Sequence, residues 1–146
     1  MFERIESDLK VALKERDSLK VQTLRLLLAE VKNETIKNRR SLDDSEIIKV
    51  IQKQIGRRQE SAGLYRKGGR TELAEKEEAE MIILKAYLPP QLPDGEIEKI
   101  VDQAIQETGA ESRKDIGKVM EKVSFEIEGR ADRGKVARMV ADRLSI

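Results

Sequence analysis

"LKAYLPPQLPDGEIEKI", the stretch from Leu84 to Ile100, contains all three prolines of this 146-residue chain. A proline inside a helix has no backbone N–H to donate and clashes with the preceding turn, at a cost of about 3 kcal/mol. It also pushes the residue before it toward extended geometry. Pro89, Pro90 and Pro93 therefore predict a stiff, extended segment, unlike the flexible linkers that glycine and serine form. We interpret this segment as a domain boundary.

Residues 1–88 carry four segments in which apolar residues recur at helical spacing. The four stripes are Phe2, Ile5, Leu9, Ala12 and Leu13; Val21, Leu24, Leu27, Leu28, Val31 and Thr35; Ile47, Ile48, Ile51, Ile55 and Ala62; and Leu73, Met81, Leu84 and Leu88. Capping signals separate the segments. These are Asp17 or Ser18 before the second, the pair Asp43 and Glu46 before the third, Gly68-Gly69 after the third, and Thr71 before the fourth. The pattern predicts a bundle of about four helices.

Residues 94–146 carry three shorter amphipathic segments. Their expected boundaries are Asp94 and Gly109, Ser112 and Gly129, and Asp132 for the start of the last. Neither half shows the alternation of a β-strand. The expected fold is all-α, with an amino-terminal bundle of about four helices and a compact carboxy-terminal three-helix domain, joined by the proline-rich break.

The amino-acid composition argues against several kinds of catalytic and metal-binding site. The chain has no cysteine and no histidine, so thiolate and imidazole metal sites and the usual general base near neutral pH are missing. The segment Gly129–Val136 resembles a phosphate-binding loop in spacing, but Val136 stands where the motif needs serine or threonine. We therefore expect no catalytic, cofactor-binding or metal-binding residues, and no enzyme activity of the chain by itself.

The expected location follows from charge and hydropathy. The amino terminus is charged from its third residue, which is unlike a secretory signal. No apolar run approaches the roughly 20 residues that a transmembrane helix needs. These features favour a cytoplasmic protein without a membrane partner.

Basic residues in the carboxy-terminal half are the best candidate site. Lys114, Lys118 and Lys122 follow at i, i+4 spacing, which places them on one stripe of a helix. The full candidate set is Arg113, Lys114, Lys118, Lys122, Arg130, Arg133 and Lys135. Contacts from such residues to phosphates would position a nucleic acid without reading its sequence. The alternative is that these side chains only keep the helices soluble.

Several stretches together resemble a known family. "AYLPPQL" at the break, "KDIGKVM" from Lys114 to Met120 and "EGRADRGKVARMVADRL" from Glu128 to Leu144 are similar to the YqeY family of small bacterial proteins. The opening "RIESDLKVALKERDSLKVQTLRLLLAEVKN" is similar to the first helices of that family. The carboxy-terminal part also resembles the tail domain of the B subunit of the tRNA-dependent amidotransferase.

The resemblance implies an all-helical two-domain fold and a link to tRNA or to a tRNA-modifying assembly. It also implies carbon–nitrogen ligase activity at the level of the family, with glutamine as amido-nitrogen donor. The kinase-like and glutaminase motifs of the tRNA-dependent amidotransferase are absent from this sequence, so we expect a non-catalytic module. The positions that match the tail domain are Asp115, Gly117, Lys118, Met120, Gly129, Ala131 and Asp132. Gly117 suggests a close approach of another helix.

The second hypothesis is a protein-interaction adaptor. In this case the amino-terminal helices dock on a protein partner, and we expect an exposed apolar strip of a few hundred Å² on their surface. The sequence does not name the partner in either hypothesis.

Overall fold

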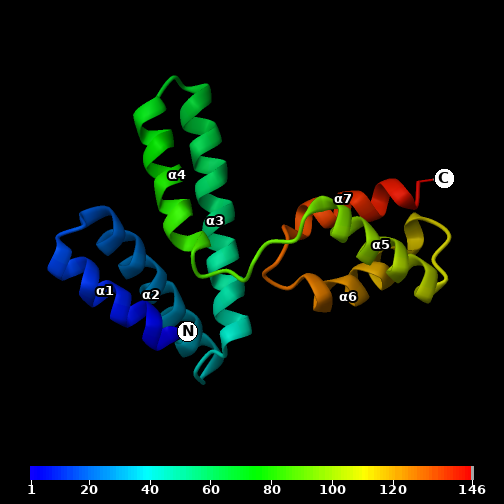
Figure 1. The fold of residues 1–146 in the computed structure, drawn as a ribbon, viewed down its shortest axis with the longest axis horizontal. Helices are drawn as coiled ribbons and strands as arrows, with labels where there is room; N and C mark the ends of the chain where they lie inside the picture. The colour runs from blue at the N-terminus through cyan, green and yellow to red at the C-terminus, as the bar shows by residue number, and fades with distance from the viewer. Residues whose placement is uncertain (146) are drawn as a thin grey trace. The chain divides into compact units, whose positions relative to one another are not determined.

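The computed structural model describes residues 1–145, and every regular element in that range is helical (Figure 1). This confirms the all-α prediction. The elements are α1 (Phe2–Glu15), α2 (Ser18–Asn38), α3 (Asp44–Lys67), α4 (Thr71–Lys85), α5 (Asp94–Thr108), a 3-10 turn η1 (Arg113–Asp115), α6 (Ile116–Ile127) and α7 (Arg133–Arg143). The chain divides into two compact units, Met1–Leu88 and Pro89–Ile146.

Side-chain hydrogen bonds cap the starts of α2, α3 and α7. The Asp17 carboxylate accepts from the backbone N–H of Lys20 at the start of α2, as predicted. Before α3, Asp43 accepts from the Glu46 N–H at 2.8 Å, and Glu46 accepts from the Asp43 N–H at 3.2 Å. This reciprocal pair is the predicted capping box, and it satisfies two amides that the helix leaves open.

Three predicted starts are wrong. Arg70, not Thr71, is the residue before α4, and no side chain caps that helix. Pro93 precedes α5 in extended geometry, so Asp94 becomes the first helical residue. There its charge still lies near the positive end of the helix dipole. Ser112 forms a capping box with Asp115, but around η1 and not directly around α6.

Two helices end on left-handed residues that the sequence did not predict. Arg16 after α1 and Arg39 after α2 both have φ of 56°. A residue other than glycine is uncommon in this region, because its Cβ crowds the backbone. Gly109 after α5 (φ 67°) and Gly129 after α6 (φ 71°) behave as predicted, since glycine adopts this geometry without that crowding.

The first unit consists of two helical hairpins, α1–α2 and α3–α4 (Figure 1). Their shared core is almost wholly aliphatic: Ile5, Leu24, Leu27, Leu28, Val31, Ile47, Val50, Ile51, Ile55, Met81, Leu84 and Tyr87. Two predicted core positions, Leu13 and Leu73, are wrong, because both side chains are exposed. In α1 the predicted Ala12 is fully buried, and in α4 Ala74, which was not predicted, is buried in place of Leu73.

Tyr87 connects the end of α4 to α1. Its hydroxyl donates a hydrogen bond to the Asp8 carboxylate, and the Arg4 guanidinium lies over its ring, 4.7 Å from the centroid. Burial and the neighbouring Asp8 raise the pKa of the Tyr87 hydroxyl above its ordinary value of 10.0. The phenol therefore stays protonated and keeps donating throughout the physiological pH range.

A buried ion pair joins α3 to α4. The Arg58 Nε donates to the Glu80 carboxylate at 2.8 Å, and both side chains are about nine-tenths buried. A second pair between the same helices, Arg66 with Glu78 at 2.7 Å, is almost half exposed. The chain therefore offers a buried and an exposed ion pair in one helical hairpin.

The second unit packs α5, α6 and α7 around its own core. This core consists of Ile97, Val101, Ala104, Val119, Met120, Val123, Ile127, Ala131, Val136, Val140 and Leu144. The proline segment is bonded to this unit at the turn between α6 and α7. The Leu92 N–H donates to the Arg130 carbonyl at 2.7 Å, and the Gln91 amide donates to the Gly129 carbonyl at 2.9 Å.

We predict that Glu46 makes stability depend on pH. The bidentate hydrogen bond from Arg40, at 2.7 and 2.8 Å, and the Asp43 amide lower the pKa of Glu46 from 4.5 to about 2. Because the charged form is the one stabilised, its contribution is complete above pH 4.5 and is lost as the pH falls toward 2. Glu46→Gln should therefore lower the thermal midpoint at pH 7 and have progressively less effect as the pH falls.

The matched control is Glu6→Gln, an exposed glutamate of α1. Thermal unfolding followed by circular dichroism, with both variants and the parent chain, measures the difference. If the gap between Glu46→Gln and the parent stays constant down to about pH 2, the assignment of the pH dependence to this carboxylate is wrong.

The buried pair gives a second prediction. Glu80→Gln leaves the Arg58 charge buried without compensation, so we expect a loss of about 3–5 kcal/mol in the free energy of unfolding. The double change Arg58→Met and Glu80→Met removes both charges and should restore most of that loss. Arg66→Met breaks the exposed pair and should cost about 1 kcal/mol or less. Urea unfolding measures all three; equal losses for Glu80→Gln and the double variant would contradict the argument.

Candidate nucleic-acid interface

The candidate residues surround α6, whose two sides differ sharply. Val119, Met120, Val123 and Ile127 lie on its buried side. Since successive helical residues turn by about 100°, the opposite side carries one row of exposed residues. That row, which we call the outer face of α6, consists of Lys118, Glu121, Lys122 and Phe125.

The seven predicted residues do not form one patch. Arg113 and Lys114 lie in η1, and Lys118 lies in the first turn of α6. Arg130 follows the other end of α6, and the last two candidates, Arg133 and Lys135, begin α7. A helix of 12 residues is roughly 18 Å long, so these two groups lie at opposite ends of α6, with the seventh candidate, Lys122, in the middle of the helix.

Three of the seven cations already have partners within the second unit. Lys122 forms an ion pair with Glu107 of α5, and Lys135 pairs with Asp94 at 2.6 Å. Arg130 donates to the backbone carbonyl of Glu126 at 3.2 Å. The hydrogen bond from Lys122 also lowers the pKa of the Glu107 carboxyl. Lys122 and Lys135 therefore join α6 and α7 to α5, whereas the Arg130 hydrogen bond is local to the end of α6.

The other four cations remain available. Arg113, Lys114, Lys118 and Arg133 are exposed, and none lies within 4.0 Å of an acidic side chain of residues 1–145. Near them, hydrogen bonds from the backbone N–H groups of Glu111 and Ser112 lower the pKa of the Asp115 carboxyl. The positive charge of Lys118 also lowers this pKa. That carboxylate is held by the backbone of the 3-10 turn.

The surroundings of Gly117 differ from the prediction, and Phe125 is an exposed residue that was not predicted. A Cβ added at Gly117 would meet no heavy atom within 4 Å, so no helix approaches closely there. Phe125, which is not among the predicted site residues, has a side chain that is 85% exposed. Its signal was present in the sequence, because Phe125 lies seven residues after Lys118 and so shares its side of the helix.

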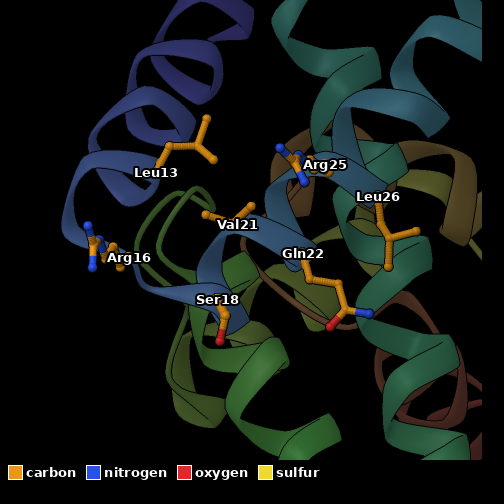
Figure 2. A pocket seen from close by; sticks show the side chains of 7 residues that line it. All are labelled: Leu13, Arg16, Ser18, Val21, Gln22, Arg25 and Leu26. Carbon is orange, nitrogen blue, oxygen red and sulfur yellow. The ribbon is translucent and has the colours of Figure 1, made fainter.

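A second surface lies on the first unit, where α1 and α2 meet. A hollow of about 480 Å³ lies there. Figure 2 shows side chains that line it, with Leu13 on α1 and Val21, Arg25 and Leu26 on α2. Its full lining is Leu13, Arg16, Ser18, Val21, Gln22, Arg25 and Leu26. Leu13 and Leu26 are nearly half exposed, so the hollow combines an apolar floor with arginines and no acidic side chain.

Two further kinds of feature are absent from residues 1–145. No three acidic side chains in this range are placed to hold a metal ion together. No helix in this range has the length and apolar character needed to cross a membrane.

The similarity of the chain to known families extends along almost its whole length. A family model described as "Yqey-like protein" matches residues 2–144. The chain belongs to this YqeY-like family. The match confirms the resemblance inferred from the proline break and the carboxy-terminal motifs, and it covers both compact units.

Curated fungal proteins, each named "Altered inheritance of mitochondria protein 41, mitochondrial", are similar to this chain. The one from Pyrenophora tritici-repentis is 32% identical over 88% of this chain and 71% of the relative. The one from Vanderwaltozyma polyspora is 31% identical over 77% of the chain and 64% of the relative. The one from Eremothecium gossypii is 35% identical over 68% and 55%. The chain therefore spans between about half and seven-tenths of these YqeY-like relatives.

These relatives contradict the expectation of a bacterial, cytoplasmic protein. They are fungal and are named as mitochondrial proteins. The cytoplasmic expectation depended on the charged amino terminus and the lack of long apolar runs, and the bacterial one on the family resemblance. Those features argue only against a secretory signal and a membrane span, and do not distinguish cytoplasm from the interior of an organelle.

Proposed function

We propose that this YqeY-like chain is a non-catalytic helical module that binds tRNA or assists a tRNA-modifying assembly. The observation that carries the proposal is the set of four exposed cations that form no ion pair with any acidic side chain of residues 1–145, namely Arg113, Lys114, Lys118 and Arg133. Phosphate groups attract such cations, because binding releases the counterions that surround a nucleic acid. The resemblance of the carboxy-terminal part to the amidotransferase tail domain supports tRNA as the nucleic acid.

The proposal includes a division of labour between two domains. Residues 1–88 form an amino-terminal bundle of four helices, and residues 94–146 form a three-helix domain that holds the cations. The segment between them acts as a stiff spacer. Hydrogen bonds from Gln91 and Leu92 to the turn after α6 support this role, because they attach the spacer to the nucleic-acid-binding domain.

The names of the fungal relatives support a mitochondrial setting for this activity. We therefore propose mitochondria as the compartment in which this chain binds tRNA.

We predict that tRNA binding depends steeply on salt. Four phosphate contacts should give a slope of about −3 to −4 in a plot of log affinity against log salt concentration. Changing Arg113, Lys114, Lys118 and Arg133 to alanine should weaken binding at low salt and flatten the slope, by about one for each cation removed. Fluorescence anisotropy with labelled tRNA measures both quantities.

The control removes the same amount of charge elsewhere. Lys10, Lys14, Lys32 and Lys37 are exposed on α1 and α2, and their combined change to alanine lowers the net charge equally. This control should bind tRNA almost as the parent chain does. If both variants lose the same affinity, the binding reflects net charge and the proposed site is wrong.

The hollow between α1 and α2 supports a second candidate function, that of a protein-interaction adaptor. Its apolar floor and its arginines fit an amphipathic helix with acidic residues beside its apolar stripe. In an affinity capture from nuclease-treated mitochondrial extract, Leu13→Glu with Leu26→Glu should lose a protein that the parent chain retains. Ile36→Glu, on an exposed part of α2 outside the hollow, should keep it. Identical captures from both variants would contradict this candidate.

A further inference from the structure

The second unit exposes one large apolar side chain, Phe125. Its ring is 85% exposed, whereas every other large exposed apolar residue among residues 1–145 belongs to the first unit. The chain has only two phenylalanines and no tryptophan, so few rings are available for its cores. Phe125 is nevertheless on the outer face of α6, directly opposite the buried side of that helix.

The surroundings of Phe125 are charged. Glu121 and Lys122 lie one turn before it, and Lys118 lies two turns before it. Lys114, in η1, extends the same side of the helix further back. Lys118 and Lys114 form no ion pair within 4.0 Å among residues 1–145, although the Lys118 charge acts on Asp115, whereas Lys122 is held by Glu107. Two cations without an ion pair in this range, Lys114 and Lys118, therefore precede the exposed ring of Phe125 along η1 and α6.

This arrangement does not suit a protein interface. Interfaces between proteins have a contiguous apolar centre, and the neighbours of Phe125 on α6 are charged. A strand of nucleic acid fits both parts of the arrangement. Its phosphates pair with the lysines, and an unpaired base presents a flat face to the ring. In a duplex the base faces are covered by stacking, so the chemistry selects a single-stranded segment.

We propose that Phe125 is a stacking platform for an unpaired RNA base, and that Lys118 and Lys114 hold phosphates of the same strand. The ligand class is single-stranded RNA, such as an unpaired loop or end of a folded RNA. This inference rests on the proposed RNA-binding function and adds to it how the RNA is recognised. Glu121, on the same face, disfavours a phosphate beside it and so directs the phosphates toward Lys118.

Phe125→Trp in the full chain provides a direct test, because the chain has no other tryptophan. A short unstructured oligoadenylate should quench the tryptophan emission, since a base stacked on the indole deactivates its excited state. The duplex of that strand with oligouridylate, at the same phosphate concentration, should bind the lysines but leave the emission almost unchanged. Equal quenching by both, or by neither while both bind, would overturn the proposal.

Affinity measurements separate stacking from general apolar contact. Phe125→Ala and Phe125→Leu should each lower affinity for oligoadenylate roughly tenfold, and Phe125→Tyr should preserve it. The slope of affinity against salt should stay the same in all three, because the phosphate contacts remain. Full affinity in Phe125→Leu would overturn stacking, because leucine keeps an apolar side chain without a ring. Since Phe125 is outside the core, circular dichroism should show unchanged folding.

The same experiments distinguish this proposal from the function on which it rests. If the parent chain binds tRNA with a steep salt slope and no Phe125 variant changes the affinity for either RNA, stacking is wrong and the phosphate site stands. If neither tRNA nor oligoadenylate binds the parent chain, both fail. Emission typical of a buried indole in free Phe125→Trp would also overturn the proposal. If that emission depended on protein concentration, the group that buries the indole would be a second copy of the chain.

Discussion

Pro89, Pro90 and Pro93 leave a five-residue stretch with only two backbone N–H donors, and the organisation of the chain depends on this constraint. A helix cannot continue through such a stretch. The Leu92 donor is satisfied by the Arg130 carbonyl, and the Gln91 side chain reaches the Gly129 carbonyl. The break is therefore attached to the turn after α6, and the second compact unit begins at Pro89.

For the proposed binding of nucleic acid, the positions of the charges matter more than the net charge. With 39% charged residues and a net charge of +1, the chain as a whole does not resemble a nucleic-acid-binding protein. Pairing within each unit uses many of these charges. Arg58 and Glu80 are buried together, while Lys122 and Lys135 tie α6 and α7 to α5. Among the seven basic candidates of the second unit, Arg113, Lys114, Lys118 and Arg133 have no ion-pair partner within residues 1–145, and we assign function to these four.

Aromatic residues are few and have opposite roles in this YqeY-like chain. Tyr87 is buried and connects α4 to α1 through Asp8, whereas aliphatic side chains fill nearly all of both cores. Phe125 is exposed among charges. A core of leucine, isoleucine and valine does not require rings, and we base the stacking proposal on Phe125 because it stands beside exposed lysines on the same side of α6.

The sequence by itself determined the helices, the position of the break and most helix ends, because apolar periodicity, proline geometry and capping boxes act over a few residues. It also determined the family, through motifs spread along the whole chain. It misplaced the starts at Thr71 and Asp94, since a neighbouring residue outside the helix occupied the capping position. Only the tertiary structure decided which cations remain available, because Glu107 and Asp94 reach Lys122 and Lys135 from a different helix. Such contacts join residues far apart in the sequence, and no local pattern reports them, whereas the position of Phe125 beside Glu121 and Lys122 could be read from helical spacing alone.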